Sequence, residues 1–261
     1  MASNRRFSSA LQALTELQSE RSESPGSGEV APAVPALRDV LAKIGSIPAE
    51  ALFLGMASDG LPVLLNLHDP HPGPMLVTGD PGSGKTIFLQ TITHALTQTH
   101  DARLLQYGVI TNYPDEWTSL TATPHRNGIF VVGNNDASEY INSLAAWAHS
   151  NKKSKQCILM LVDDMESVAL LDPPSVHNFR WLLLRGPARR VWPIVTLSAP
   201  RYGQVLAWLQ NYRTRIFGRV ANPRVAQALG AEKVSLEQLE AGIQFSLPER
   251  EKWLRFWLPS C

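Results

Sequence analysis

The chain has 261 residues, 44% of them hydrophobic, which suits one α/β domain with a sizeable core. The net charge of +1 excludes a strongly basic nucleic-acid-binding protein, although a local basic patch is compatible with a balanced total. With only Cys157 and Cys261 we expect no disulfide framework, and with no apolar run near the roughly 20 residues of a membrane span we expect a cytoplasmic protein without direct membrane insertion.

The first 36 residues read as a flexible tail that contains a weak helix. Apolar side chains follow helical spacing from Phe7 to Leu17, but Ser, Pro and Gly dominate residues 22–28, and Pro32 and Pro35 keep the chain extended. Two interpretations stay open. The tail is either a solvated, disordered extension or a helix that docks on a neighbouring subunit or a protein partner.

From residue 37 onward the pattern is that of one α/β domain. A short helix is expected at 36–41, and a hairpin pairs 51–56 with 61–67 before a buried strand at 75–78. Further strands alternate with helical stretches, which is the βαβ rhythm of a mainly parallel sheet. These strands are expected at residues 103–110, 128–132, 157–163, 193–197 and 216–220.

Two helix starts and one final strand complete the pattern. Residues 136–139 and 235–238 look like capping boxes, in which side chains bind the free N–H groups of a helix start. Residues 252–258 are dense in large apolar side chains and end at Pro259, which favours a closing strand. A partner-binding aromatic patch is the alternative for this segment.

Residues 79–86 fit the pattern GxxxxGK[ST] and lie between a strand and a helix, as a phosphate-binding loop requires. The glycines let backbone N–H groups turn inward around phosphate oxygens, and the helix N-terminus adds partial positive charge. Lys85 should reach the β- and γ-phosphates, and Thr86 should ligate Mg²⁺. We therefore predict that the chain binds ATP with Mg²⁺. The predicted nucleotide-binding residues are Gly79, Asp80, Pro81, Gly82, Ser83, Gly84, Lys85, Thr86 and Ile87.

A second acidic motif follows the apolar run 158–162, which ends in Asp163 and Asp164. Such a run is typical of a strand buried on both faces, and its carboxyl end would open beside the phosphate loop, where open α/β sheets bind ligands. Asp163 is predicted to hold Mg²⁺ through water. Together the two motifs predict a nucleoside triphosphatase site.

With these motifs, the sequence resembles a motor domain of the FtsK/HerA superfamily, which belongs to the additional-strand class of P-loop ATPases. The similarity spans about residues 50–250, and the order of several weaker motifs makes it specific. These motifs are 54–67 for "LG … G-x-PV … L", 74–79 for "PHLLVAG", 185–191 for "GRAAGIH", 193–200 for "LILATQRP", 214–220 for "TRIAFRV" and 229–242 for "GGAEKLLGMG". The resemblance implies a RecA-like fold over residues 37–261, with a mainly parallel sheet flanked by helices and an N-terminal β-hairpin.

The family is known for hexameric rings that pump double-stranded DNA, with relatives that drive conjugation and protein secretion. The resemblance therefore implies an ATP-hydrolysing motor that forms a homo-oligomeric ring on double-stranded DNA. Two alternatives stay open: a secretion or conjugation ATPase with a protein substrate, and a nucleotide-dependent scaffold with weak hydrolysis.

The catalytic candidates include departures from the family pattern. Asp164 stands where the family carries a Glu that polarises water, and it is one methylene shorter. Four interpretations stay open: the backbone compensates for the shorter side chain, a second water compensates, hydrolysis is slow, or Glu166 swings in from the following turn. Asp164 also reads as a helix-capping carboxylate. Ser198 stands where the family has a sensing Gln, which couples the γ-phosphate to the translocating loops. Arg215 and Arg189 are candidates for the arginine that completes a neighbour's site, and each also reads as a solvated cation.

Overall fold

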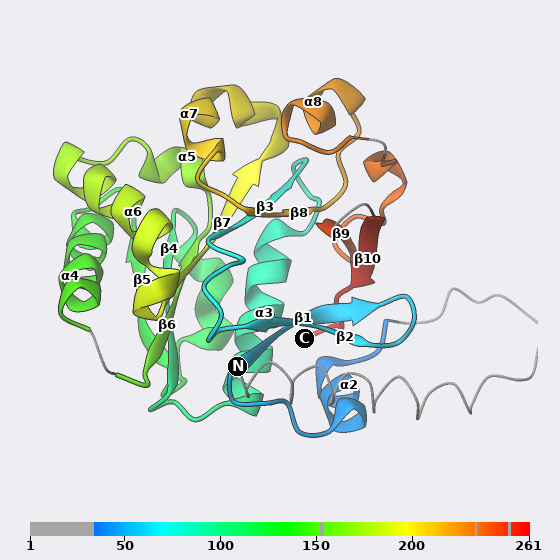
Figure 1. The fold of residues 1–261 in the computed structure, drawn as a ribbon, viewed down its shortest axis with the longest axis horizontal. Coiled ribbons are helices and arrows are strands. Elements are labelled where there is room, and N and C mark those ends of the chain that lie inside the picture. The colour runs from blue at the N-terminus through cyan, green and yellow to red at the C-terminus, as the bar shows by residue number, and fades with distance from the viewer. Residues whose placement is uncertain (1–33, 152–153, 233, 250–251) are drawn as a thin grey trace, which may run out of the picture.

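The computed structural model describes residues 34–151, 154–232, 234–249 and 252–261 (Figure 1). The strands form one sheet in the order β2-β1-β10-β9-β8-β3-β7-β6-β4-β5. Their bounds are β1 (Ala51–Ala57), β2 (Pro62–Asn66), β3 (Met75–Gly79), β4 (Leu105–Thr111), β5 (Arg126–Val131), β6 (Cys157–Val162), β7 (Val191–Ser198), β8 (Thr214–Phe217), β9 (Gln244–Glu249) and β10 (Lys252–Trp257). The α-helices are α2 (Leu37–Ile44), α3 (Lys85–Thr99), α4 (Asp136–Ser150), α5 (Met165–Val168), α6 (Pro173–Arg185), α7 (Leu206–Leu209) and α8 (Pro223–Ala228). Short 3₁₀ segments are η1 (Pro114–Leu120), η2 (Pro187–Arg189), η3 (Ala199–Val205) and η4 (Leu236–Gln238).

The sheet has a parallel part and an antiparallel extension. Strands β8, β3, β7, β6, β4 and β5 pair in parallel, whereas β9, β10, β1 and β2 continue the sheet with antiparallel pairs. The predicted α/β fold with a mainly parallel sheet and an N-terminal hairpin is therefore confirmed. The predicted strands are all present, with ends that differ by up to three residues.

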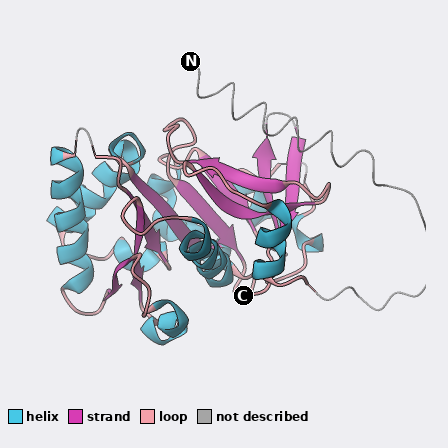
Figure 2. Cartoon of the chain, turned by 90° about the horizontal axis from the view of Figure 1, so that it is seen from below, coloured by secondary structure: helices cyan, strands magenta, loops and turns pink. Residues whose placement is uncertain are grey.

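The two faces of the parallel part are covered by different helices (Figures 1 and 2). In β6, Ile158, Met160 and Val162 pack in the cluster that holds α4 and α6, and the alternate Leu159 and Leu161 pack in the cluster that holds α3. This alternation follows from the two-residue period of a strand. Because both faces are covered, the strand is apolar along its whole length.

The antiparallel extension holds both ends of the described domain. In α2, Leu37 and Leu41 pack against Phe53 of β1. The Leu37 N–H donates to the Ser260 carbonyl at 2.7 Å, so the start of the domain lies beside its end. Within β1, a side chain on Gly55 would collide with the Phe256 ring, since an added Cβ would lie 2.6 Å from it.

The final strand is part of the core. Phe256 and Leu258 are buried, and Trp253 packs against Phe217. This confirms the predicted closing strand. Trp253 and Trp257 are only half-buried, so the partner-binding aromatic patch stays a prediction. The predicted tail lies almost wholly outside the described residues, so its flexibility and its docking role stay predictions. Among the helices of the described ranges, none is both long and apolar enough to cross a membrane.

The two predicted capping boxes are wrong in their side-chain contacts. Helix α4 starts at Asp136, but the residue before it is Asn135, and no side chain caps the free N–H groups there. Ser235 precedes η4, also without a capping bond. Side chains do cap α6 and α8, where Asp172 and Asn222 each accept from a backbone N–H two or three residues on. Both of these helices begin with proline, whose missing N–H costs nothing at a helix start.

Candidate nucleotide-binding site

The phosphate loop joins the buried strand β3 to helix α3, as its sequence context predicts. Gly82 and Gly84 have φ of 77° and 91°, a region that favours glycine. An added Cβ on Gly84 would lie 2.5 Å from the Gly242 Cα, so a larger residue would displace backbone. Loops of this shape, ahead of a helix N-terminus, present N–H groups to phosphate oxygens. Ile87, in the first turn of α3, is 48% exposed beside the loop.

Neighbouring segments hold the loop in place. The Asp80 N–H donates to the Arg219 carbonyl at 2.8 Å, and an Asp80 carboxylate oxygen accepts from the Ala221 N–H at 2.7 Å. On the other side, the Gly242 N–H donates to the Ser83 carbonyl at 3.1 Å. Ser83 itself is buried, and its hydroxyl has no partner among the described residues. Asp80 therefore fastens the loop to the segment after β8.

Lys85 is held by neutral groups. Its ammonium nitrogen donates to the carbonyls of Gly79 at 3.2 Å and Asp80 at 3.0 Å. Within the described part of the chain it forms no ion pair. Burial lowers the pKa of Lys85, and the carboxylates of Asp163, Asp164, Glu166 and Asp80 partly oppose that shift. The charge is thus placed at the loop without a direct counterion, which suits contact with a phosphate.

The predicted magnesium residues are in direct contact. The Thr86 hydroxyl donates to Asp163, 3.2 and 3.0 Å from its two carboxylate oxygens. Thr196 donates to the same carboxylate at 3.0 Å. Burial raises the pKa of Asp163, and the hydrogen bonds from Thr86 and Thr196 oppose the shift. Among the described residues, hydroxyl groups are the side-chain partners of this carboxylate, and no cationic side chain is bonded to it.

These donors fit Mg²⁺, which usually takes one or two protein oxygens and completes its shell with water and substrate phosphates. Among the residues described, no group of three or more His, Cys, Asp or Glu side chains lies close enough to hold a metal by itself. The hydroxyl of Thr86 and the carboxylate of Asp163 would hold the ion, which supplies charge to the phosphate oxygens when bound. The roles of both residues stay predictions.

Asp164 has an unusual backbone. Its φ is 95° and its ψ is 83°, a left-handed conformation, and its N–H donates to the Thr196 hydroxyl at 2.9 Å. Although it directly precedes α5, its side chain makes no capping bond, which contradicts the interpretation as a helix cap. Two residues on, Glu166 is buried with neither carboxylate oxygen bonded in the described residues. Burial and the adjacent Asp164 raise the pKa of Glu166 to about 7.

The other catalytic candidates are distributed over both ends of the sheet. Ser198 ends β7 opposite Gly79 of β3, and so lies at the phosphate loop. Arg215, in the second position of β8, donates to the carbonyls of Leu229 at 2.7 Å and Leu209 at 2.8 Å. Arg189 lies in η2, just before β7 begins. Neither arginine reaches the site of its own chain, and a role in a neighbour's site stays a prediction.

Sequence reasoning missed two residues that shape the site. Thr196 binds both the Asp163 carboxylate and the Asp164 N–H. Its signal was a polar side chain inside an otherwise apolar strand. Gly242 leaves room for Gly84. In the sequence it is only an isolated glycine, and its φ of 83° and its contact with Gly84 are revealed by the structure.

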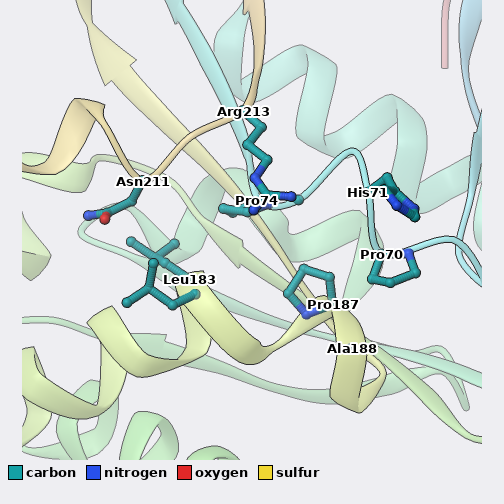
Figure 3. A pocket seen from close by; sticks show the side chains of 10 residues that line it. Pro70, His71, Pro74, Leu183, Pro187, Ala188, Asn211 and Arg213 are labelled. Atoms are coloured by element: carbon teal, nitrogen blue, oxygen red, sulfur yellow. The ribbon is translucent and has the colours of Figure 1, made fainter.

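A different hollow, of about 220 Å³, lies at the opposite end of the sheet (Figure 3). It is lined by Pro70, His71, Gly73, Pro74, Leu183, Leu184, Pro187, Ala188, Asn211 and Arg213. Pro74 and Arg213 directly precede β3 and β8, so the hollow faces the amino ends of these strands. The phosphate loop follows the carboxyl end of β3, and the two regions are therefore separate.

The fold and the loop define a RecA-like P-loop protein. Strand β7 lies between β3, which leads into the phosphate loop, and β6, which ends at Asp163. One strand therefore separates the two motifs in the sheet.

The chain matches no protein-family profile and no curated protein sequence. It is similar to solved ATPase structures. The cytoplasmic domain of the type VII secretion ATPase EccC from Thermomonospora curvata aligns with 91% of this chain at TM-score 0.70 and 18% identity. A structure of ATPases 2 and 3 of the same EccC, in complex with a signal sequence peptide, aligns with 91% at TM-score 0.70 and 17% identity. The pCW3 conjugation coupling protein TcpA, with ATPγS, aligns with 88% at TM-score 0.63 and 14% identity.

The chain spans 29% and 44% of the two EccC chains and 70% of TcpA. At these identities the likeness concerns the fold. It supports the RecA-like fold that the sequence predicts.

Proposed function

We propose that this chain is an ATP-hydrolysing motor subunit of FtsK/HerA type. The observation that supports this most is the contact of Thr86 with Asp163, beside a lysine bound only to neutral carbonyls. Lys85 would bind the terminal phosphates of ATP, and Thr86 with Asp163 would hold Mg²⁺. ATPases with this fold in the solved structures support the same reading of the site.

The proposed assembly is a homo-oligomeric ring, and the proposed substrate is double-stranded DNA, which the ring would translocate. In such rings a neighbour's arginine stabilises charge on the transferring phosphoryl group. A protein substrate is the second candidate. It is supported by the EccC structure that contains a signal sequence peptide, and by the near-neutral charge of this chain.

ATP turnover of the purified protein tests the enzyme, with Lys85→Ala as the key variant and the exposed Lys155→Ala as its matched control. We expect Lys85→Ala to abolish turnover and nucleotide retention, whereas Lys155→Ala behaves as wild type. Turnover above about one per second would exclude a scaffold with negligible hydrolysis. Turnover that survives in Lys85→Ala would overturn the assignment of this site.

The same assay with duplex DNA separates the two substrates. For a DNA motor we expect turnover to rise with duplex DNA and this stimulation to weaken as salt increases, because salt competes for phosphate contacts. The mass of the assembly with a non-hydrolysable ATP analogue, with and without the duplex, then tests for a ring. Turnover and mass that ignore DNA would contradict the DNA motor and favour the protein substrate.

A further inference from the structure

Glu166 is a buried acidic side chain that lies against a second carboxyl group. It is 7% exposed, and no donor group of the described residues bonds to its carboxylate oxygens. Besides burial, a hydrogen bond shared with the Asp164 carboxyl group raises its pKa. Burying an unpaired carboxylate destabilises a fold, whereas a glutamine of the same shape would carry no charge there. Buried polar groups without partners are rare, so each one points to a role beyond packing.

The position of Glu166 connects it to the nucleotide site. Helix α5, which carries it, directly follows the acidic end of β6 and packs against β7 and η3. Strand β7 ends at Ser198, opposite Gly79 at the start of the phosphate loop. The carboxylate of Glu166 is also close enough to Lys85 for its charge to raise the pKa of the ammonium. Glu166 therefore lies in the same electrostatic environment as Lys85.

The neighbouring Asp164 is placed differently. Its backbone φ of 95° belongs to a left-handed conformation that is unfavourable for a non-glycine residue. Its N–H is fixed by Thr196, which also fixes Asp163. The side chain of Asp164 is only half-buried. Because Thr196 and this backbone turn hold Asp164, α5 begins at Met165, two residues after the predicted magnesium ligand Asp163. Glu166 lies in the first turn of α5.

We propose that Glu166, and not Asp164, is the carboxylate that takes the proton from the attacking water during ATP hydrolysis; this inference rests on the proposed function. The water oxygen forms a new bond to the γ-phosphorus, and the bond from that phosphorus to the β,γ-bridging oxygen breaks. The bonding electrons leave with ADP. One water proton passes to the Glu166 carboxylate and then to solvent, and the products are ADP and inorganic phosphate.

The charged groups acting on Glu166 suit this role. Asp164 and burial disfavour its ionised form, whereas Arg201 of η3 favours it. A general base works best when its pKa lies near the operating pH, because it must both accept and release the proton.

The test compares Glu166→Gln with Asp164→Asn in the full chain under saturating Mg·ATP. We expect Glu166→Gln to lower kcat at least about 100-fold, the usual scale of a lost general base, and Asp164→Asn to lower it less than about 10-fold. ATP affinity, measured by calorimetry, should stay within about threefold of wild type in both variants. The melting temperature of Glu166→Gln should equal or exceed that of wild type, because a buried charge beside the Asp164 carboxyl group has been removed.

A purely structural role for Glu166 would instead lower the melting temperature or the ATP affinity of Glu166→Gln. Full turnover in Glu166→Gln, or a larger loss in Asp164→Asn, would overturn the assignment while leaving the ATPase intact. A wild-type protein that binds ATP but never hydrolyses it would overturn the proposed function, and this inference with it. The two failures are therefore distinguishable.

Discussion

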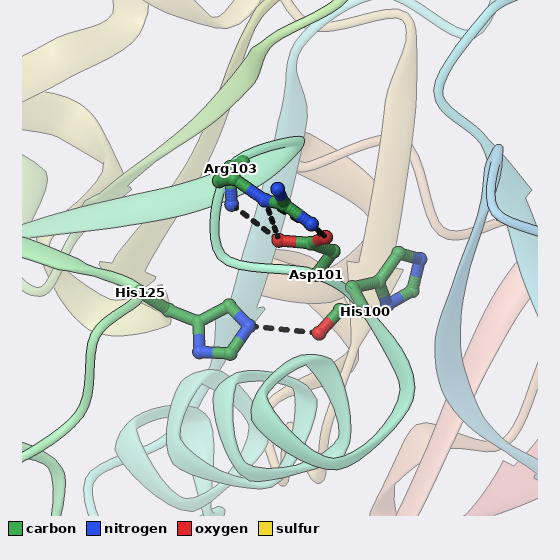
Figure 4. Close-up of polar contacts among 4 residues, drawn as sticks. All are labelled: His100, Asp101, Arg103 and His125. Carbon is green, nitrogen blue, oxygen red and sulfur yellow. Dashed lines mark hydrogen bonds and ion pairs between the residues drawn. The ribbon is translucent and has the colours of Figure 1, made fainter.

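Two aspartates of this molecule, Asp101 and Asp163, differ in both burial and hydrogen-bond partners. Before β4, the Asp101 carboxylate accepts from the Arg103 guanidinium at distances of 2.6 to 3.1 Å, on the surface and within one turn of chain (Figure 4). After β6, Asp163 is buried, and its hydroxyl partners Thr86 and Thr196 come from distant parts of the chain. The exposed carboxylate has a full cationic partner, whereas the buried one forms no ion pair within the part of the chain that the structure describes.

The comparison teaches that burial without a counterion distinguishes the end of the sheet at which we propose the nucleotide site. An exposed ion pair is screened by water and contributes little to stability. A buried carboxylate without a cation costs stability, unless a ligand with positive charge completes it. We therefore expect substitutions at the buried end to change activity strongly, and substitutions at the exposed pair to change almost nothing.

Asp163→Asn should have the largest effect. The amide keeps the shape of the side chain but loses the charge that would face Mg²⁺, so we expect turnover to fall at least about 100-fold. Steady-state ATP hydrolysis over a range of Mg²⁺ concentrations measures this. The exposed Asp115→Asn is the matched control and should retain wild-type rates. Equal rates in both variants would contradict the metal role of Asp163.

Gly84→Ala should destabilise the loop itself. The left-handed backbone and the 2.5 Å approach to the Gly242 Cα predict a loss of about 2 to 4 kcal/mol in the free energy of unfolding. Urea denaturation measures the loss, and nucleotide binding should weaken as well. Gly133→Ala is the control, because an added Cβ there meets nothing within 4 Å. A stable Gly84→Ala variant that binds nucleotide would contradict the described loop.

Arg215→Met should reduce stability rather than catalysis. Two carbonyls, of Leu209 and Leu229, would lose their donor, and we expect a loss of about 2 kcal/mol in the free energy of unfolding. Arg189→Met should be nearly neutral for stability. If Arg215→Met instead stays fully stable and loses turnover only in the oligomer, the role in a neighbour's site is the correct one.

Asp101→Asn should have the smallest effect. Hydrogen bonds from Arg103 lower the pKa of Asp101 from 3.8 to about 2, so the carboxylate contributes stability above pH 3.8 and loses it as the pH falls toward 2. Because the pair is exposed, the melting temperature at pH 7 should change by less than about 2 °C. Melting curves between pH 2 and 7 check this, and a large shift would contradict the comparison.

The sequence predicted the framework well because it depends on local patterns. The phosphate loop, the acidic end of β6 and the hairpin β1–β2 all follow from motif spacing and apolar runs. The role of Thr196 and the isolation of Glu166 depend on which distant strands lie side by side, which no local pattern reveals. The capping boxes failed for a related reason: the pattern of residues 136–139 was present, but the helix begins at Asp136 itself, one residue earlier than a cap at Asp136 requires.

The pairing of Leu37 with Ser260 has a consequence for engineering. The two ends of the described domain emerge at one corner, so fusions to either end would project from the same side. A short glycine-serine bridge between them would yield a circular permutant whose new ends can be opened in a surface loop. Two fluorophores attached at this corner would stay close while the domain is folded and separate when it unfolds.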